Sequence, residues 1–254
     1  MAEARDTSRA VLATDGLTRR FGGLVAVRDV SIALNRGELH AVIGPNGAGK
    51  TTLVSLLSGE IRPTSGRILL DGAEIGAVPS FKRTRLGIGR SFQRTNIFPT
   101  LTALENVRLS AQAVTHTGHW LKPAAKETRL IDIARAALAR VGLDAVAQRT
   151  AGALSHGEQR QLEIAMTLAC APKVLLLDEP LAGMGPEESQ RLTGLLKGLA
   201  REHAILLIEH DMDFVFAVAD WMTVMAEGAV LAEGVPAAIR GNAAVQSAYL
   251  GGHA

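Results

Sequence analysis

The nine residues GPNGAGKTT, at positions 44–52, satisfy the pattern G-x-x-x-x-G-K-[ST] of a phosphate-binding loop. An apolar run at 39–43 precedes the loop and predicts a strand, and the apolar spacing at 50–58 predicts a helix. Strand, glycine-rich loop and helix in this order are the context that the motif requires. We therefore expect a phosphate site here and not a glycine-rich turn that binds nothing.

The chemistry of the loop follows from its glycines, its lysine and its threonine. Glycines let backbone N–H groups turn toward phosphate oxygens, and the helix adds the partial positive charge of its N-terminus. Lys50 is expected to reach the β- and γ-phosphates, and the Thr51 hydroxyl is expected to ligate Mg²⁺. The residues expected to contact the nucleotide are Gly44, Asn46, Gly47, Ala48, Gly49, Lys50, Thr51 and Thr52.

The patterns on both sides of the loop predict an α/β domain. Helices are expected at 128–141 and from Pro186 onward. Strands are expected at 39–43, 67–70, 174–177, 204–208, 222–225 and 229–232, with tight turns at Asp71-Gly72 and Glu227-Gly228. Strands that alternate with helices predict a parallel sheet, and the helical stretch at about 99–154 predicts an inserted subdomain.

The composition excludes several other classes of protein. The 254 residues carry 27 Lys+Arg against 25 Asp+Glu, a net charge of +2, and only 4% are aromatic. This balance argues against a basic surface for nucleic acid and against base-stacking platforms. The single cysteine, Cys170, allows no internal disulfide. No apolar run approaches the ~18 residues that cross a bilayer, and we expect no secretory signal and a cytoplasmic location.

A second loop-and-helix pattern, LSHGEQRQLEIA, lies at 154–165. Taken alone, it favours Ser155 as a helix N-cap with Glu158 as its capping-box partner, although a second phosphate site also fits. Two further residues are equally ambiguous on their own. Phe21 reads as a core residue, and His210 reads as a helix-cap or core histidine.

The order of the motifs adds a family resemblance. The phosphate loop, Gln93 in GRSFQRTNIFPTLTALENV, LSHGE, VLLLDEP and IEHD together resemble the ATP-binding subunits of ABC transporters, over about residues 12–251. The resemblance implies one ABC ATPase domain with a P-loop core, a mixed or parallel sheet and an antiparallel β subdomain. The core would span about 10–98 and 160–235, the helical subdomain about 99–159, and a C-terminal extension about 236–254.

The same resemblance implies roles for individual residues. Phe21 would stack on the adenine of ATP, and Gln93 would link the metal and the attacking water to the membrane subunits. The signature at 154–158 would touch the γ-phosphate of ATP held by the opposite subunit, through Ser155 and Gly157, with Glu158 beside them.

The acidic and histidine motifs complete the implied site. Asp178 would hold Mg²⁺ through water, together with Thr51 and Gln93. Glu179 would be the catalytic base, and His210 would be the switch histidine that holds water and phosphate in line.

Three positions depart from the common family pattern. His156 and Glu158 stand where glycine and glutamine are usual, and Gly185 stands where the loop after DEP usually carries aspartate. Ser155 and Gly157 match the family pattern, so the expected phosphate contacts remain. Because Gly185 replaces the usual aspartate, the sequence leaves open how the two subunits would communicate across the dimer. The segment 149–153 does not resemble the glutamate-containing segment of many exporters, which favours an importer.

LLLDEPLAGMGPEES, IEHDMDFVF and the ending AYLG resemble the ATP-binding proteins of branched-chain amino-acid importers. This implies a second ATPase subunit, usually a different chain and otherwise a copy of this one. It also implies two membrane-spanning permease subunits, an external substrate-binding protein and a peripheral place on the cytoplasmic side of the inner membrane. Urea-import and lipopolysaccharide-export ATPases remain alternatives, followed by soluble ABC ATPases acting on DNA or ribosomes and by P-loop kinases.

Overall fold

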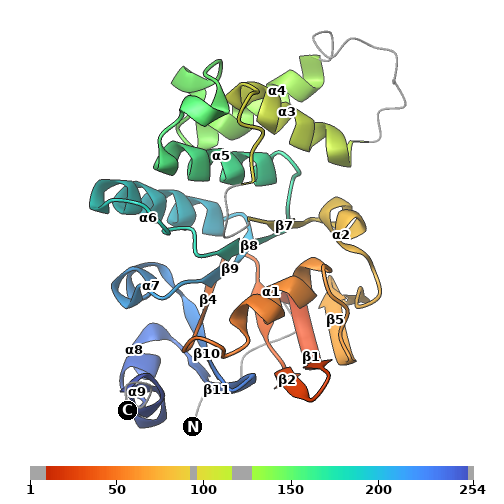
Figure 1. The fold of residues 1–254 in the computed structure, drawn as a ribbon, viewed down its shortest axis with the longest axis vertical. Coiled ribbons are helices and arrows are strands. Elements are labelled where there is room, and N and C mark those ends of the chain that lie inside the picture. Colours follow the sequence, from red (N-terminus) through yellow and green to blue (C-terminus); the bar gives the residue numbers. More distant parts are fainter. Residues whose placement is uncertain (1–9, 92–95, 116–127, 251–254) are drawn as a thin grey trace.

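The computed structural model describes residues 10–91, 96–115 and 128–250. Gln93 and Gly251, the last residue of the AYLG ending, lie outside this part of the chain. The molecule is elongated (Figure 1). One end of its long axis holds helices α3 (Ala103–Val114), α4 (Thr128–Arg140) and α5 (His156–Leu168), and strands β1 (Ala10–Phe21), β2 (Leu24–Val30) and β5 (Ser65–Leu70) lie near the other.

A six-stranded sheet of order β11-β10-β4-β9-β8-β7 forms the centre of the fold. All neighbouring pairs are parallel except β10 and β11, which form an antiparallel hairpin. The strands are β4 (Leu39–Ile43), β7 (Ile88–Arg90), β8 (Val174–Asp178), β9 (Ala204–Ile208), β10 (Trp221–Ala226) and β11 (Ala229–Gly234). The expected strand positions in this sheet are confirmed.

The two faces of this sheet bury alternate residues of the same strands. Leu176 and Leu206 belong to a core shared with α1 (Lys50–Ser58) and the second sheet. Leu175 and Leu207 belong to a core shared with the helices on the opposite face. Side chains that alternate between two buried faces explain why these strands read as continuous aliphatic runs.

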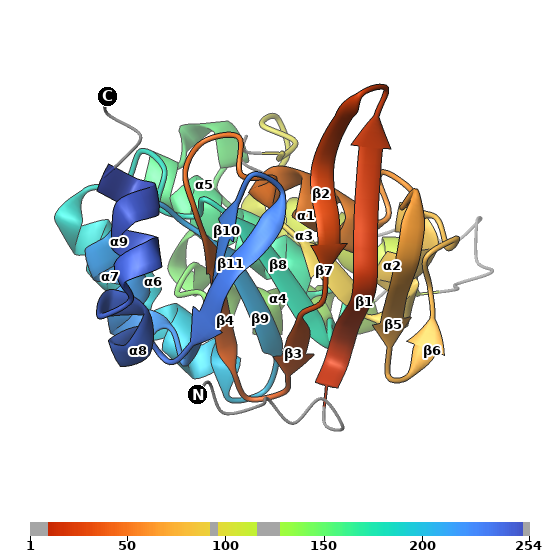
Figure 2. The same ribbon diagram turned by 90° about the horizontal axis from the view of Figure 1, so that it is seen from below.

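A second, antiparallel sheet packs over α1, as Figure 2 shows from below. Its path is β2-β1-β5-β6, and β3 pairs with β1 off this path. The strands are β1 (Ala10–Phe21), β2 (Leu24–Val30), β3 (Ala33–Asn35), β5 (Ser65–Leu70) and β6 (Ala73–Glu74). The mixed sheet, this antiparallel sheet and the helical layer together confirm the expected fold class.

Both expected tight turns are present. Asp71 and Gly72 join β5 to β6, and Glu227 and Gly228 join β10 to β11. All four residues have positive φ, between 48° and 80°. Two consecutive residues of positive φ match the right-handed twist of the flanking strands, so such turns favour Asn/Asp-Gly and related pairs.

Helices cover the rest of the sheet and form a separate layer. Helices α3, α4 and α5 pack against one another and share one apolar core with α6. The remaining helices are α2 (Ser80–Leu86), α3 (Ala103–Val114), α4 (Thr128–Arg140), α5 (His156–Leu168), α6 (Pro186–Ala200), α7 (Met212–Val218), α8 (Pro236–Arg240) and α9 (Ala243–Leu250), with 3₁₀ turns at Asp144–Val146 and Ala151–Ala153. The expected helices at 128–141 and from Pro186 onward are confirmed.

Candidate functional site

The phosphate loop connects the end of β4 to the start of α1, where two glycines fix its path. Gly44 has a φ of 150° and Gly49 a φ of 98°. A Cβ on Gly44 would collide with the carbonyl oxygen of Met225 in β10, and one on Gly49 with that of Ala26 in β2. Both glycines are therefore required by backbone conformation and by close approach of neighbouring strands.

The N-terminus of α1 has the properties of an anion site. Its N-cap, Gly49, offers no side-chain hydrogen bond to the first turn, and that turn contains no acidic residue. Unsatisfied N–H groups and the helix dipole together attract a phosphate. The Lys50 ammonium lies over the loop and donates to the carbonyl oxygens of Gly44 at 2.6 Å and Pro45 at 3.0 Å.

The loop opens into a cleft of about 780 Å³. Its lining includes loop residues 46–52, residues 23–26 at the start of β2, and Glu179 from the end of β8. The structure thus brings a carboxylate from a distant part of the sequence into the same cleft as Lys50. Burial lowers the pKa of Lys50, and the nearby carboxylates of Glu179 and Asp178 oppose that shift.

Glu179 leaves the sheet in a strained conformation. Its φ is 49°, in the left-handed region that non-glycine residues seldom occupy, and its N–H donates to the Ile208 carbonyl at 2.9 Å. Such conformations cost about 1–3 kcal/mol and cluster at functional sites. The strain lets the chain turn immediately after the buried Asp178, so that Glu179 lines the cleft.

His210 lies next to Glu179 and is largely solvent-exposed. Its Nδ1 is 3.8 Å from Glu179 Oε1 and 3.8 Å from Glu209 Oε2, and 73% of its side chain is exposed. The helix cap expected of a lone histidine is supplied instead by Asp211, whose carboxylate accepts from the Phe214 N–H of α7. His210 is therefore neither a core residue nor a cap.

Asp178 provides an oxygen that fits a hard divalent cation. The residue is 2% exposed, and its buried Oδ2 accepts no hydrogen bond within the described part of the chain. The Arg90 Nη2 lies 3.7 Å from this oxygen, beyond hydrogen-bonding range. Burial raises the pKa of Asp178, and Arg90 is the strongest influence against that rise. Carboxylate and hydroxyl oxygens such as those of Asp178 and Thr51 are ligands that Mg²⁺ prefers.

The signature residues lie at the N-terminus of α5, and Ser155 is its N-cap. The Ser155 hydroxyl accepts from the Glu158 N–H at 3.2 Å, and Glu158 Oε2 accepts from the Ser155 N–H at 2.7 Å. The capping box expected from these residues is therefore present. The Glu158 carboxylate is therefore engaged at the helix end, and Ser155 itself is exposed to solvent.

A smaller cavity of about 160 Å³ separates the starts of α5 and α6, and Ser155 and Gly157 line it. A Cβ on Gly157 would collide with the Glu188 carboxylate, which also accepts from the Gly185 N–H at 3.2 Å. None of these residues lines the cleft of the phosphate loop. Within the described residues, one chain therefore does not bring its signature to its own phosphate loop.

Two sequence expectations have different outcomes here. Phe21 is 43% exposed, so its interpretation as a core residue is wrong. Its ring stacks against the Arg19 guanidinium, whose Cζ lies 4.4 Å from the ring centroid. It ends β1, directly before the turn that leads to cleft residues Gly23 and Leu24. Gln93 lies outside the described residues, and its expected role stays a prediction.

Sequence reasoning missed the buried charges that support the site. Glu209 is 2% exposed and accepts from the Leu181 and His210 N–H groups at 2.8 and 3.2 Å, which ties the loop after β8 to the loop after β9. Arg160 and Glu163 form a buried pair in α5 at 2.7 Å. The available signals were the position of Glu209 directly after an aliphatic strand and the opposite charges of Arg160 and Glu163 three residues apart.

Comparison with known proteins agrees with this geometry. A family profile described as "ABC transporter" matches residues 27–182, from β2 to the loop after β8. This chain belongs to the ABC transporter family. A second profile, "Branched-chain amino acid ATP-binding cassette transporter", matches residues 229–254 of the ABC ATPase.

Curated relatives match the ABC ATPase over nearly its whole length. The high-affinity branched-chain amino acid transport ATP-binding protein BraF of Pseudomonas aeruginosa is 42% identical, covering 96% of this chain and 99% of that protein. LivG of Escherichia coli K12, with the same description, is 40% identical with the same coverage. A probable LivG of Archaeoglobus fulgidus is 34% identical over 95% of both chains.

Solved structures share the fold of the ABC ATPase. The ADP conformation of MJ1267, an ATP-binding cassette of an ABC transporter, has a TM-score of 0.86 and 29% identity, covering 95% of this chain and 99% of that one. CbiO1 of Clostridium perfringens, part of the cbiONQ transporter complex, has a TM-score of 0.81 and 28% identity, covering 96% and 99%. In the described part of the ABC ATPase, every helix is too short or too polar to cross a membrane.

Proposed function

We propose that this chain is the ATP-hydrolysing subunit of an ABC importer for branched-chain or related amino acids. The observation that carries the ATPase activity is the shared cleft of Lys50, the phosphate loop and Glu179. Hydrolysis of a phosphoanhydride needs a positioned water and neutralised phosphate charge more than covalent help from the protein. This cleft offers groups for both tasks.

The roles follow from chemistry and position. Lys50 and the first N–H groups of α1 bind the phosphates, and Thr51 and Asp178 hold Mg²⁺, which when bound supplies further positive charge against the phosphate oxygens. The Glu179 carboxylate orients the attacking water and accepts its proton, and His210 holds that water in line with the phosphate. Phe21 stacks on adenine, and Gln93 completes the metal and water contacts.

A complete site requires a second ATPase subunit. Ser155 and Gly157 line a cavity other than their own phosphate cleft and, in this proposal, receive the γ-phosphate of ATP bound to the partner, while Glu158 holds the helix end in shape. The partner is a different ATPase chain, with a second copy of this chain as the lesser possibility. ATP then favours the closed dimer, and hydrolysis removes that preference.

The transport assignment rests on relatives whose names describe branched-chain amino acid transport and on the family profile at the C-terminus. We propose two permease subunits, an indirect link to an external binding protein and a peripheral position on the cytoplasmic side of the membrane, with no nucleic-acid partner. The single domain would comprise a core at 10–98 and 160–235, the helical subdomain at 99–159 and the extension at 236–254.

Reconstitution tests the assignment. The chain is combined with its co-purifying ATPase and permease subunits in vesicles, and ATP hydrolysis is measured with the external binding protein and leucine, urea or lipopolysaccharide. We expect leucine, isoleucine or valine to stimulate hydrolysis, and the Glu179→Gln chain to abolish that stimulation. Stimulation by urea or lipid, with none from an amino acid, would refute the substrate and leave the ATPase mechanism standing.

A further inference from the structure

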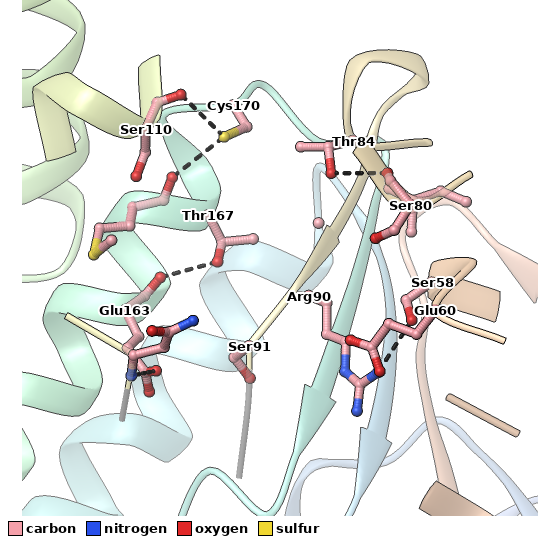
Figure 3. Close-up of a pocket in the computed structure, with 14 residues that line it drawn as sticks. Ser58, Glu60, Ser80, Thr84, Arg90, Ser91, Ser110, Glu163, Thr167 and Cys170 are labelled. Atoms are coloured by element: carbon pink, nitrogen blue, oxygen red, sulfur yellow. Dashed lines mark hydrogen bonds and ion pairs between the residues drawn. The ribbon is translucent and has the colours of Figure 1, made fainter. Parts of the chain in front are cut away.

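A cavity of about 190 Å³ lies between the sheet edge and the helical layer, away from the phosphate cleft. Strand β7 and helices α2, α3 and α5 supply most of its lining. Glu60, which follows α1, stands at this cavity, and the Arg90 guanidinium lies beside it (Figure 3). Arg90 is the last residue of β7 and pairs in register with Leu176 of β8, two residues before Asp178.

Arg90 lies between two carboxylates, that of Glu60 at this cavity and that of the buried Asp178 at the end of β8. Its Nη1 is 2.7 Å from Glu60 Oε2 and donates to Ser58 Oγ at 3.0 Å, so this end is tightly held. Its Nη2 is 3.7 Å from Asp178 Oδ2, close enough for charge attraction but too far for a hydrogen bond. One buried cation therefore touches the cavity at one end and the proposed metal ligand at the other.

The two contacts are unequal in distance and in burial. The Arg90 side chain is 10% exposed, Asp178 is 2% exposed, and Glu60 is 36% exposed. Attraction between charges rises as their distance and the polarity of the surroundings fall. The buried Asp178 would therefore draw the guanidinium inward if the Glu60 charge did not oppose it, because the Ser55 and Ser58 hydroxyls that Nη1 also contacts carry no charge. A closer guanidinium would then occupy the same carboxylate oxygen that a divalent cation needs.

We propose that Arg90 is a positioning residue shared by two carboxylates, and that Glu60 holds it back so that Asp178 Oδ2 stays available to Mg²⁺. This inference rests on the proposed function, because it takes Asp178 as a metal ligand. Glu60 then influences the nucleotide site from another cavity, through Arg90 alone. A change that neutralises Glu60 weakens Mg²⁺ binding, and that effect disappears when Arg90 is absent.

A double-mutant cycle tests the coupling without relying on turnover. ADP binding to the full chain is measured by calorimetry at a series of Mg²⁺ concentrations, for wild type, Glu60→Gln, Arg90→Gln and the double variant. We expect Glu60→Gln to raise the half-saturating Mg²⁺ concentration by about tenfold, the change produced by moving the guanidinium about 1 Å closer to Asp178 at an intermediate dielectric. Arg90→Gln and the double variant should have the same half-saturating Mg²⁺ concentration.

The control is Arg67→Gln, which removes a comparable arginine from the exposed pair with Asp15 on the antiparallel sheet. It should leave the Mg²⁺ dependence unchanged. Arg90→Lys keeps the charge but loses the forked geometry, and we expect it to reduce the effect of Glu60→Gln.

Two results would overturn the inference. Either Glu60→Gln leaves the Mg²⁺ dependence at the wild-type value, or its effect persists at full size in the Arg90→Gln background. If Arg90→Gln fails to fold, the effect of Glu60→Gln on Mg²⁺ dependence is compared in the wild-type and Arg90→Lys backgrounds instead. Wild-type ADP binding that ignores Mg²⁺ would refute the metal assignment itself, whereas Mg²⁺-dependent binding with a silent Glu60→Gln refutes only the role of Arg90.

Discussion

Single residues of this ATPase have two tasks that substitution can separate, namely holding a local fold and performing chemistry. Glu179 illustrates both, because its left-handed backbone turns the chain out of β8 while its carboxylate lines the cleft. The amide of glutamine has nearly the same shape but cannot accept a proton at neutral pH. A change from carboxylate to amide therefore tests the chemistry and leaves the turn intact.

We expect Glu179→Gln to bind ATP normally and to hydrolyse it at least about a hundredfold more slowly, the lower range for loss of a general base. Steady-state phosphate release and ATP binding by calorimetry check the two halves of this prediction. Glu187→Gln, a fully solvated change in the first turn of α6, is the matched control and should leave both values unchanged. Hydrolysis close to wild type in Glu179→Gln would remove Glu179 from the role.

Lys50 gives a second prediction at the scale of one side chain. Its ammonium donates to two loop carbonyls, so the group that is proposed to face the phosphates also contacts the loop itself. Lys50→Met should lower ATP affinity by at least about tenfold while changing thermal stability little, because the side chain is only half-buried. Unchanged ATP affinity would show that the ammonium serves the loop alone.

At the scale of elements, the N-terminus of α5 combines a helix cap with a proposed phosphate contact. Aspartate caps a helix as well as serine does, but its negative charge repels a phosphate. Alanine does the opposite, because it removes the cap and adds no charge. Two substitutions at Ser155 therefore separate the two roles.

We expect Ser155→Asp to melt near the wild-type temperature and to lose ATP-dependent association with the second ATPase subunit. Ser155→Ala should cost about 1 kcal/mol of stability and weaken association less than Ser155→Asp does, because it removes the hydroxyl contact without adding a repelling charge. Thermal melts and light scattering with and without ATP measure both properties. If Ser155→Asp associates as wild type does, Ser155 is only a cap.

The C-terminus of α1 depends on a buried arginine from α2. Arg83 is 1% exposed and donates to four carbonyl oxygens, including those of Leu56 and Leu57 in the last turn of α1. Burial without a carboxylate lowers the pKa of Arg83 to about 10, so it stays protonated at neutral pH. The phosphate-loop helix is thus anchored at the end opposite its anion site.

Arg83→Met should lower the free energy of unfolding by about 3 kcal/mol, because it leaves several buried carbonyls of α1 and its following loop without donors. Chemical denaturation measures this loss. Arg85→Met, at an exposed position in the same helix, should cost less than about 0.5 kcal/mol. A loss as small as that of Arg85→Met would show that water replaces the guanidinium.

The sequence predicted those elements whose signals are local. The aliphatic runs of β4, β8 and β9 and the turn at Glu227-Gly228 depend on period and turn chemistry, and all of them are confirmed. The exposure of Phe21 was not predictable, because an aromatic at a strand end fits a core and a surface equally well. Arg83 and Arg90 were missed because their partners come from other elements, and such pairings leave no period in the sequence.

At the scale of the whole molecule, the phosphate loop and the signature line separate cavities, so activity should depend on assembly. We expect the isolated chain to hydrolyse ATP slowly, and the rate to rise on addition of the second ATPase subunit that co-purifies with it. Glu179→Gln with ATP should accumulate a stable dimer, seen by light scattering. Full activity at a concentration where the chain is a monomer would show that one chain completes its own site.

The strand order of the central sheet has a consequence for synthesis on the ribosome. Strand β4 precedes the phosphate loop and lies between β9 and β10 in the sheet. The last residue of β10 follows the end of β4 by about 180 positions in the chain. At about 5–20 residues per second, roughly 10–40 s pass between the translation of β4 and that of its second neighbour. For most of this interval β4 has neither lateral partner, because β9 ends only at Ile208, and the emerging chain presents an apolar strand that ribosome-associated chaperones would shield.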